Sequence, residues 1–179
     1  MKRLTLLRHA KSGDDGLVAR DFDRRLNAKG RRAARAIGRY LRDEGLRFDA
    51  VVASPAVRVT ETIAEVATGY GTAIAPAWER RIYLASAAEL LEVVHDTPAE
   101  AGSLLLVGHN PGIEQLVLLL VPGGGDTARG HVEEKYPTAS LAGISLDVAG
   151  WNEVAAGGGR LERFVRPRDL DPDLGPDAD

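Results

Sequence analysis

Three short apolar segments constrain the fold more strongly than any other feature of this sequence. They are Leu4–Leu7, Ala50–Ala53 and Leu104–Val107, and each is followed by a segment with the pattern of a helix. A half-exposed strand alternates apolar and polar residues, whereas a strand buried on both faces is apolar along its whole length. The sequence therefore predicts an α/β fold: a three-layer α/β/α sandwich around a mainly parallel sheet.

Capping residues predict where the helices begin and end. Asn27 is a good N-cap for a helix that continues to about Asp43 and is ended by Gly45. Ser54 followed by Pro55 predicts a second helix, with Ser54 as its N-cap and Pro55 at its first position. Further helices are expected over about Ala87–His95 and from Pro111, and strands over Leu141–Val148 and Leu161–Val165.

Charge is distributed unevenly along the 179 residues. The chain has 23 Lys+Arg and 26 Asp+Glu, a formal net charge of −3, yet residues 1–47 hold 14 basic and 6 acidic residues. Residues 167–179 hold five Asp and one Arg, so residues 1–166 carry 22 basic against 21 acidic residues, or +1. We predict one domain over residues 1–166 and an acidic, disordered Pro/Asp-rich tail over 167–179.

Composition excludes several classes of protein. The absence of cysteine rules out disulfides, thiolate catalysis and Cys-ligated metals. Net acidity argues against a nucleic-acid partner, and the basic face of the helix after Asn27 is interpreted as a solvated surface. We find neither a signal peptide nor an apolar stretch of membrane-spanning length, so a cytoplasmic protein without a membrane partner is expected. Histidines and carboxylates lack metal-ligand spacing, which predicts no metal and no cofactor.

Polar residues follow each of the three predicted strands. Arg8 and His9 stand at the end of the first, Ser54 and Arg58 after the second, and His109 after the third. In an open α/β sheet, ligands bind at the carboxyl ends of the strands. We therefore expect these side chains to surround one small ligand.

The residue types in this group favour phosphoryl transfer. The planar, permanently charged guanidiniums of Arg8 and Arg58 suit recognition of phosphate oxygens. In the absence of cysteine, the imidazole of His9 is the best candidate for covalent attack on phosphorus. Such a reaction requires positioning and charge stabilisation, which the arginines and His109 supply without a metal.

Four motifs within residues 2–148 resemble those of a known family. The family is the histidine phosphatase superfamily, and in particular its small SixA-type phosphohistidine phosphatases. The motifs are Arg8-His9-Ala10-Lys11-Ser12, similar to the Arg-His-Gly signature; Asp23-Arg24-Arg25-Leu26 with Gly30 and Ala34; Ser54-Pro55-Ala56-Val57-Arg58 with Thr60 and Thr62; and Gly108-His109-Asn110-Pro111.

This resemblance implies a phosphoglycerate mutase-like fold and a metal-independent phosphatase. His9 would be the nucleophile that becomes phosphorylated, while Arg8, Arg58 and His109 would bind the phosphoryl group. The substrate would be a protein phosphohistidine or a small phosphorylated molecule. Two alternatives stay open: a phosphoglycerate-mutase-like enzyme, disfavoured by the short span of 55 residues from Ser54 to His109, and a non-catalytic phosphate-binding module.

Three further residues, Glu79, Lys11 and Ser12, have two possible interpretations each. In larger members of the superfamily a carboxylate after the third strand is the general acid, and Glu79 is the nearest candidate, unless it pairs with a neighbouring arginine. Lys11 and Ser12 either line the mouth of the pocket or belong to a solvated loop. Arg24 is expected to pair with a nearby carboxylate. Two histidines are expected outside the site: His95 and His131.

Overall fold

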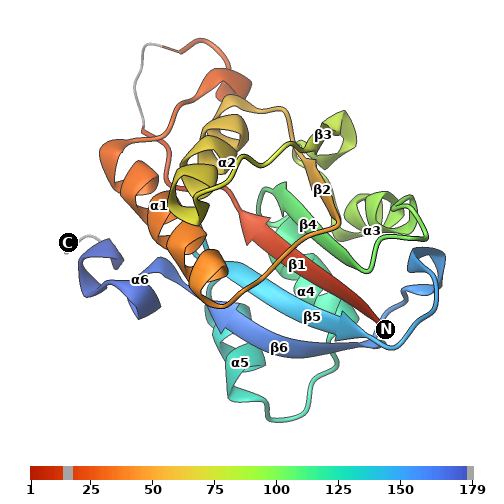
Figure 1. The fold of residues 1–179 in the computed structure, drawn as a ribbon. Helices are drawn as coiled ribbons and strands as arrows, with labels where there is room; N and C mark the ends of the chain where they lie inside the picture. Colours follow the sequence, from red (N-terminus) through yellow and green to blue (C-terminus); the bar gives the residue numbers. More distant parts are fainter. Residues whose placement is uncertain (14–17, 177–179) are drawn as a thin grey trace.

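The computed structural model describes residues 1–13 and 18–176, which form helices on both faces of a six-stranded sheet (Figure 1). The strand order is β3-β2-β4-β1-β5-β6. The first four strands pair in parallel, whereas β5 is antiparallel to both β1 and β6. The predicted three-layer sandwich around a mainly parallel sheet is confirmed. The strands are β1 (Lys2–Arg8), β2 (Ala50–Ala53), β3 (Ala77–Trp78), β4 (Ser103–Gly108), β5 (Leu141–Leu146) and β6 (Gly159–Val165).

Helices α1 and α2 cover one face of the sheet, and α3, α4 and α5 cover the other (Figure 1). A short helix, α6, follows the last strand and lies beside α1. The helices are α1 (Ala28–Asp43), α2 (Val57–Tyr70), α3 (Ala87–His95), α4 (Gly112–Leu120), α5 (Thr127–Glu134) and α6 (Pro167–Leu170), with 3-10 turns η1 (Asp21–Asp23), η2 (Arg80–Ile82), η3 (Trp151–Glu153) and η4 (Pro172–Leu174).

The burial of β4 on both faces of the sheet explains why its sequence is apolar throughout. Leu104 and Leu106 pack into the core on the α3 and α4 side, whereas Leu105 and Val107 pack into the core on the α1 and α2 side. All four side chains are at most 1% exposed. Successive side chains of a strand point to opposite faces, so a strand covered on both sides needs an apolar residue at every position.

One predicted helix start is confirmed and another is wrong. The side chain of Asn27 accepts a hydrogen bond from the backbone N–H of Gly30 at 2.8 Å, and α1 begins and ends as expected. In contrast, α2 begins at Val57 with Ala56 as its N-cap. The hydroxyl of Ser54 lies 2.8 Å from a ring nitrogen of His109. The serine therefore serves the strand-end site rather than capping the helix.

The C-terminal segment is ordered over residues 167–176, contrary to the expected disordered tail. Pro167 occupies the first turn of α6, and the carboxylate of Asp169 accepts hydrogen bonds from the backbone and side chain of Arg166. Leu174 is 8% exposed and packs into the core of α1 and α2. One buried leucine and two proline-started turns thus hold a segment whose acidic composition indicated disorder. Residues 177–179 lie outside the described part, and the domain boundary stays a prediction.

The other predicted elements agree closely with the structure. α3 has the expected bounds, and α4 begins at Gly112 with Pro111 as its N-cap. β5 ends two residues earlier than predicted and β6 begins two residues earlier. Among the described residues, no helix has both the length and the apolar character needed to cross a bilayer.

Two glycines allow α1 and α2 to pack backbone against backbone. A Cβ atom at Gly38 of α1 would lie 2.1 Å from the carbonyl oxygen of Val66, and one at Gly69 of α2 would lie 2.1 Å from that of Arg35. Atoms cannot approach so closely, and backbone cannot rotate away as a side chain can. The spacing of these two helices therefore depends on glycine.

We expect Gly38→Ala to lower the free energy of unfolding by about 1–3 kcal/mol, because the added methyl group forces α1 away from α2. The measurement is urea unfolding followed by circular dichroism. The matched control is Gly130→Ala in α5, where a Cβ meets nothing within 4 Å. That substitution should stabilise the protein by about 0.5–1 kcal/mol, as alanine does in a helix. Equal effects of the two substitutions would contradict the packing argument.

Candidate active site

The pairing of β1 with β4 brings two histidines together. The last residues of these parallel strands, Arg8 and Gly108, are register partners, so His9 and His109 both follow directly at the same edge. Their ring centroids are 5.3 Å apart. β2 pairs with β4 in the same direction and ends beside them at Ser54. The strand ends thus meet as the sequence predicted.

These strand ends line a cavity of about 490 Å³ that contains all four predicted site residues. Lys11 and Ser12 also line it, which favours the first of the two interpretations left open for them. The full lining is Arg8, His9, Lys11, Ser12, Asp21, Arg24, Arg58, Leu84, His109, Asn110 and Thr138.

His9 is buried and has one defined free nitrogen. Its Nδ1 lies 2.7 Å from the carbonyl oxygen of Ala10, and because a carbonyl only accepts, Nδ1 must carry the hydrogen and donate. Burial lowers the pKa of His9 to about 3, so the ring is neutral near pH 7. The lone pair then resides on Nε2, which is the form that a nucleophile requires.

The loop after His9 is held by both α1 and α2. The N–H of Ala10 donates to Thr62 Oγ1 at 2.9 Å, and this hydroxyl donates in turn to the carbonyl of Arg58 at 2.6 Å. On the other side, a Cβ at Gly30 of α1 would lie 2.1 Å from the carbonyl oxygen of Lys11. The motif residues Gly30 and Thr62 therefore fix the position of His9 without lining the cavity themselves.

His109 is oriented by Ser54. Its Nε2 lies 2.8 Å from Ser54 Oγ, and if the hydroxyl donates there, Nδ1 carries the ring hydrogen. Burial, and secondarily the charge of Arg58, lowers the pKa of His109 to about 4. A neutral imidazole held in this way presents one N–H from Nδ1.

Three buried donors of the site lack a hydrogen-bond partner within the described chain. They are Nε of Arg8, Nε of Arg58 and Nδ1 of His109, and only one other buried side-chain atom of the described residues, Ser140 Oγ, shares this condition. A buried donor without a partner costs about 1–3 kcal/mol. An anion with several oxygens, such as a phosphoryl group, would satisfy such donors together.

Sequence reasoning missed Asp21, which lies in η1 and lines the cavity. Its carboxylate accepts hydrogen bonds from Arg58 Nη2 at 2.9 Å and from the hydroxyl of Tyr83 at 2.7 Å. Arg24 donates to it at 3.0 Å, which confirms the pairing expected for that arginine. Burial raises the pKa of Asp21, but the hydrogen bonds from Tyr83 and Arg58 outweigh burial, so the net shift is downward. Asp21 was missed because no spacing in the sequence connects it with Arg58.

Glu79 does not line the cavity. Its carboxylate accepts hydrogen bonds from the side chain of Arg81 at 3.1 Å and from its backbone at 3.0 Å, so the alternative of a surface pair holds. His95 and His131 also lie outside the lining, as expected. Within residues 1–13 and 18–176, no three histidine or carboxylate side chains are grouped to hold a metal ion.

Comparison with known proteins identifies the family. Residues 4–80 match the model of the histidine phosphatase superfamily (branch 1). An uncharacterized protein of Mycobacterium tuberculosis is 36% identical over 167 residues, which cover 90% of this chain and 100% of that protein. The chain belongs to the histidine phosphatase superfamily. It is therefore a phosphatase.

Solved structures agree with this membership. A protein of Nakamurella multipartitia assigned as the phosphohistidine phosphatase SixA is 30% identical, with a TM-score of 0.80 over 93% of this chain and 96% of that one. A protein histidine phosphatase SixA complexed with tungstate has a TM-score of 0.76 at 20% identity, covering 94% and 99% of the two chains. At that identity the likeness concerns the fold alone. The fold is the phosphoglycerate mutase-like fold that the sequence predicted.

The buried histidines make stability depend on pH in a defined window. Unfolded histidine has a pKa near 6.5, whereas His9 titrates at about 3 and His109 at about 4 in the folded protein. Between these values the unfolded chain binds more protons, so stability is full above pH 6.5 and falls as the pH decreases. Each histidine contributes at most about 1.4 kcal/mol per pH unit.

We therefore expect His9→Asn to reduce the loss of stability between pH 6.5 and 4 relative to the parent protein. The measurement is the free energy of urea unfolding at half-unit steps of pH, taken as the difference between the two proteins so that carboxylate titration cancels. A constant difference across this range would show that His9 is protonated in the folded state, contrary to the geometry.

Proposed function

We propose that this phosphatase hydrolyses phosphohistidine on a protein in the cytoplasm, without a metal, through a phosphorylated form of its own His9. The observation that carries the proposal is the arrangement around that residue. A neutral imidazole with a free Nε2 shares a cavity with three buried, unpartnered donors from Arg8, Arg58 and His109. The similarity to proteins assigned as SixA phosphohistidine phosphatases supports the choice of substrate.

In the first step, Nε2 of His9 attacks phosphorus and the bond from phosphorus to the substrate nitrogen breaks. The phosphoryl oxygens would be held by the two arginines and by Nδ1–H of His109, which stabilise the charge that spreads over them in the transition state. In the second step, water attacks this phosphorus, the bond from phosphorus to Nε2 of His9 breaks, and inorganic phosphate leaves with the protons of the water. The nucleophile is then free for another cycle.

The surroundings of the leaving group suit a phosphohistidine substrate. Among the described residues, Asp21 is the one carboxylate that lines the cavity, and its hydrogen bonds with Arg58 and Tyr83 keep its pKa low, so it is a poor proton donor. An alkoxide leaving group needs a proton, whereas a protonated phosphohistidine releases neutral imidazole. The site therefore favours cleavage of a P–N bond over a P–O bond.

Substrate binding would change the partners of Arg58. In the free protein its Nη1 and Nη2 donate to the backbone oxygen and the carboxylate of Asp21. Phosphoryl oxygens compete for the same guanidinium, while Nε is already unpaired. Asp21 thus acts as a positioning residue that holds Arg58 at the cavity before the phosphoryl group arrives.

We expect His9→Ala to abolish hydrolysis of a phosphohistidine protein and to leave no acid-labile phosphate on the chain, because Nε2 is the attacking atom. Phosphate release without added metal and rapid-quench trapping with labelled substrate measure the two effects. The matched control is His131→Ala, on α5 and outside the cavity, which should retain activity. Full activity of His9→Ala would refute the mechanism.

A panel of small phosphoesters separates the proposal from its alternatives. Faster turnover of a phosphoester than of phosphohistidine by the parent protein would assign a small-molecule substrate. Transfer of phosphate between hydroxyls without release would indicate a mutase. Phosphate binding with no turnover of any substrate would indicate a binding module.

We expect Ser54→Ala to reduce kcat about 10-fold, because His109 loses the hydroxyl that fixes its tautomer. A long-range nitrogen NMR correlation should show a mixture of tautomers at His109 in this variant. The matched control is Ser86→Ala, which removes the N-cap of α3, a residue that does not line the cavity. It should cost about 1 kcal/mol of stability and leave kcat unchanged. A single unchanged tautomer in Ser54→Ala would contradict the positioning role.

A further inference from the structure

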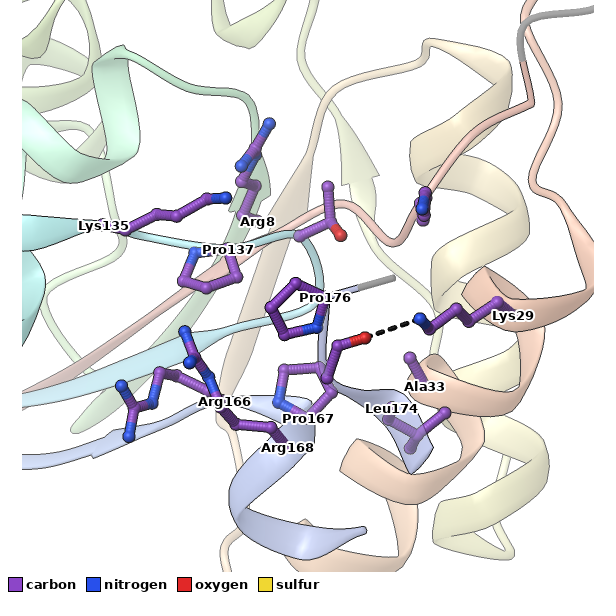
Figure 2. Close-up of a pocket in the computed structure, with 13 residues that line it drawn as sticks. Arg8, Lys29, Ala33, Lys135, Pro137, Arg166, Pro167, Arg168, Leu174 and Pro176 are labelled. Atoms are coloured by element: carbon purple, nitrogen blue, oxygen red, sulfur yellow. Dashed lines mark hydrogen bonds between the residues drawn. The ribbon is translucent and has the colours of Figure 1, made fainter. Parts of the chain in front are cut away.

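A second cavity, of about 460 Å³, adjoins the candidate active site, and among residues 1–13 and 18–176 its lining contains basic residues but no acidic ones (Figure 2). We call it the basic cavity. Apolar and small residues, among them Ala33, Leu174 and three prolines, form its walls. Its basic residues are Arg8, Lys11, Lys29, Lys135, Arg166 and Arg168.

The basic cavity borders directly on the active site. Arg8, Lys11 and Thr138 line both of them. A substrate whose phosphoryl group lies at His9 can therefore extend past Arg8 into the basic cavity. Whatever this cavity binds is then close to the reacting group and contributes to substrate selection.

The positive charges come from separate elements and do not converge on one point. Figure 2 shows Lys29 of α1 on one side of the cavity and Lys135, which follows α5, on the other. Lys29 donates to the carbonyl of Gly175, and Arg166 pairs with Asp169 at 3.0 Å. Cations on opposite sides of a cavity suit several carboxylates along a chain better than one compact phosphate.

Lys135 and Arg168 are the cations best placed for an external partner. The side chain of neither residue forms a hydrogen bond or a salt bridge with the described part of the chain, and Lys135 is exposed. Arg168 belongs to α6, the segment whose composition indicated a disordered tail. The ordered C-terminal segment thus has a role beyond packing: it supplies one wall of the basic cavity and part of its charge.

We propose that the basic cavity binds an acidic segment of the phosphoprotein substrate that lies near its phosphohistidine. The inference rests on the proposed function, because only a protein substrate carries such a segment. Carboxylates complement the spread cations, and the apolar walls accommodate the aliphatic stems of glutamate side chains and the peptide backbone.

The first test is binding of unphosphorylated probe peptides, which does not depend on turnover. A Glu/Gly peptide should bind the parent protein more tightly than a Gln/Gly peptide of equal length, and the difference should shrink at high salt. The double variant Lys135→Gln/Arg168→Gln should weaken binding of the acidic peptide roughly 3- to 10-fold. Arg160→Gln, which removes an exposed cation of β6 outside the cavity, is the matched control and should change nothing.

The second test is hydrolysis of phosphohistidine peptides with acidic or neutral flanks. The double variant should raise KM for the acidic peptide by the same factor, with kcat retained and little change for the neutral peptide. Equal effects on both peptides would overturn the inference. So would a loss of pyrophosphate binding without a loss of acidic-peptide binding, which would indicate a phosphate site. Thermal melting of the double variant confirms that it is folded.

The two proposals fail in different ways. If the parent protein hydrolyses acidic and neutral phosphohistidine peptides with the same KM, the proposed function stands and the inference about the basic cavity is wrong. If it binds the acidic probe through Lys135 and Arg168 but hydrolyses no phosphohistidine peptide, the cavity is supported and the proposed function is wrong.

Discussion

The parallel pairing of β1 with β4 is the constraint on which the rest of the site depends. In-register pairing sets Arg8 opposite Gly108, so the residues that follow, His9 and His109, emerge at one edge of the sheet. β2 pairs with β4 in the same direction and delivers Ser54 beside them. Because both faces of these strands are buried, a one-residue slip would move each side chain into the opposite core, where it would not fit the packing around it. The core that stabilises the fold therefore also fixes the spacing of the polar groups.

Burial at this edge of the sheet lowers the pKa of the two histidines and makes the ligand-free protein less stable. Desolvation lowers the pKa of His9 to about 3, which keeps its Nε2 unprotonated near neutral pH. The same burial leaves donors of Arg8, Arg58 and His109 without partners in the described chain. Packing elsewhere, including the contact between α1 and α2, must offset that cost. An anion that accepts hydrogen bonds from these donors would remove this cost. Part of its binding free energy would therefore come from donors that have no partner in the free protein.

Local sequence patterns gave wrong or missing predictions for residues whose partners lie far away in the chain. Ser54 has the local signature of an N-cap, yet its hydroxyl is taken by His109, 55 residues away. Asp21 carries no motif but becomes the main partner of Arg58 once η1 packs beside α2. The last segment looks disordered by composition, yet the buried Leu174 and two proline-started turns hold it against α1. In each case a long-range contact outweighed a local preference.

The sequence by itself determined the layered α/β fold, the helix that starts after Asn27 and the four residues at the strand ends. These follow from periodicity, capping and strand order, which are local properties or consequences of burying apolar runs. Only the tertiary structure decided which nitrogen of His9 is free, that Asp21 rather than Glu79 lines the cavity, and that the C-terminal segment forms a wall of the basic cavity. Those features depend on contacts between residues far apart in the chain. The burial that determines how favourable these contacts are cannot be predicted from a local sequence pattern.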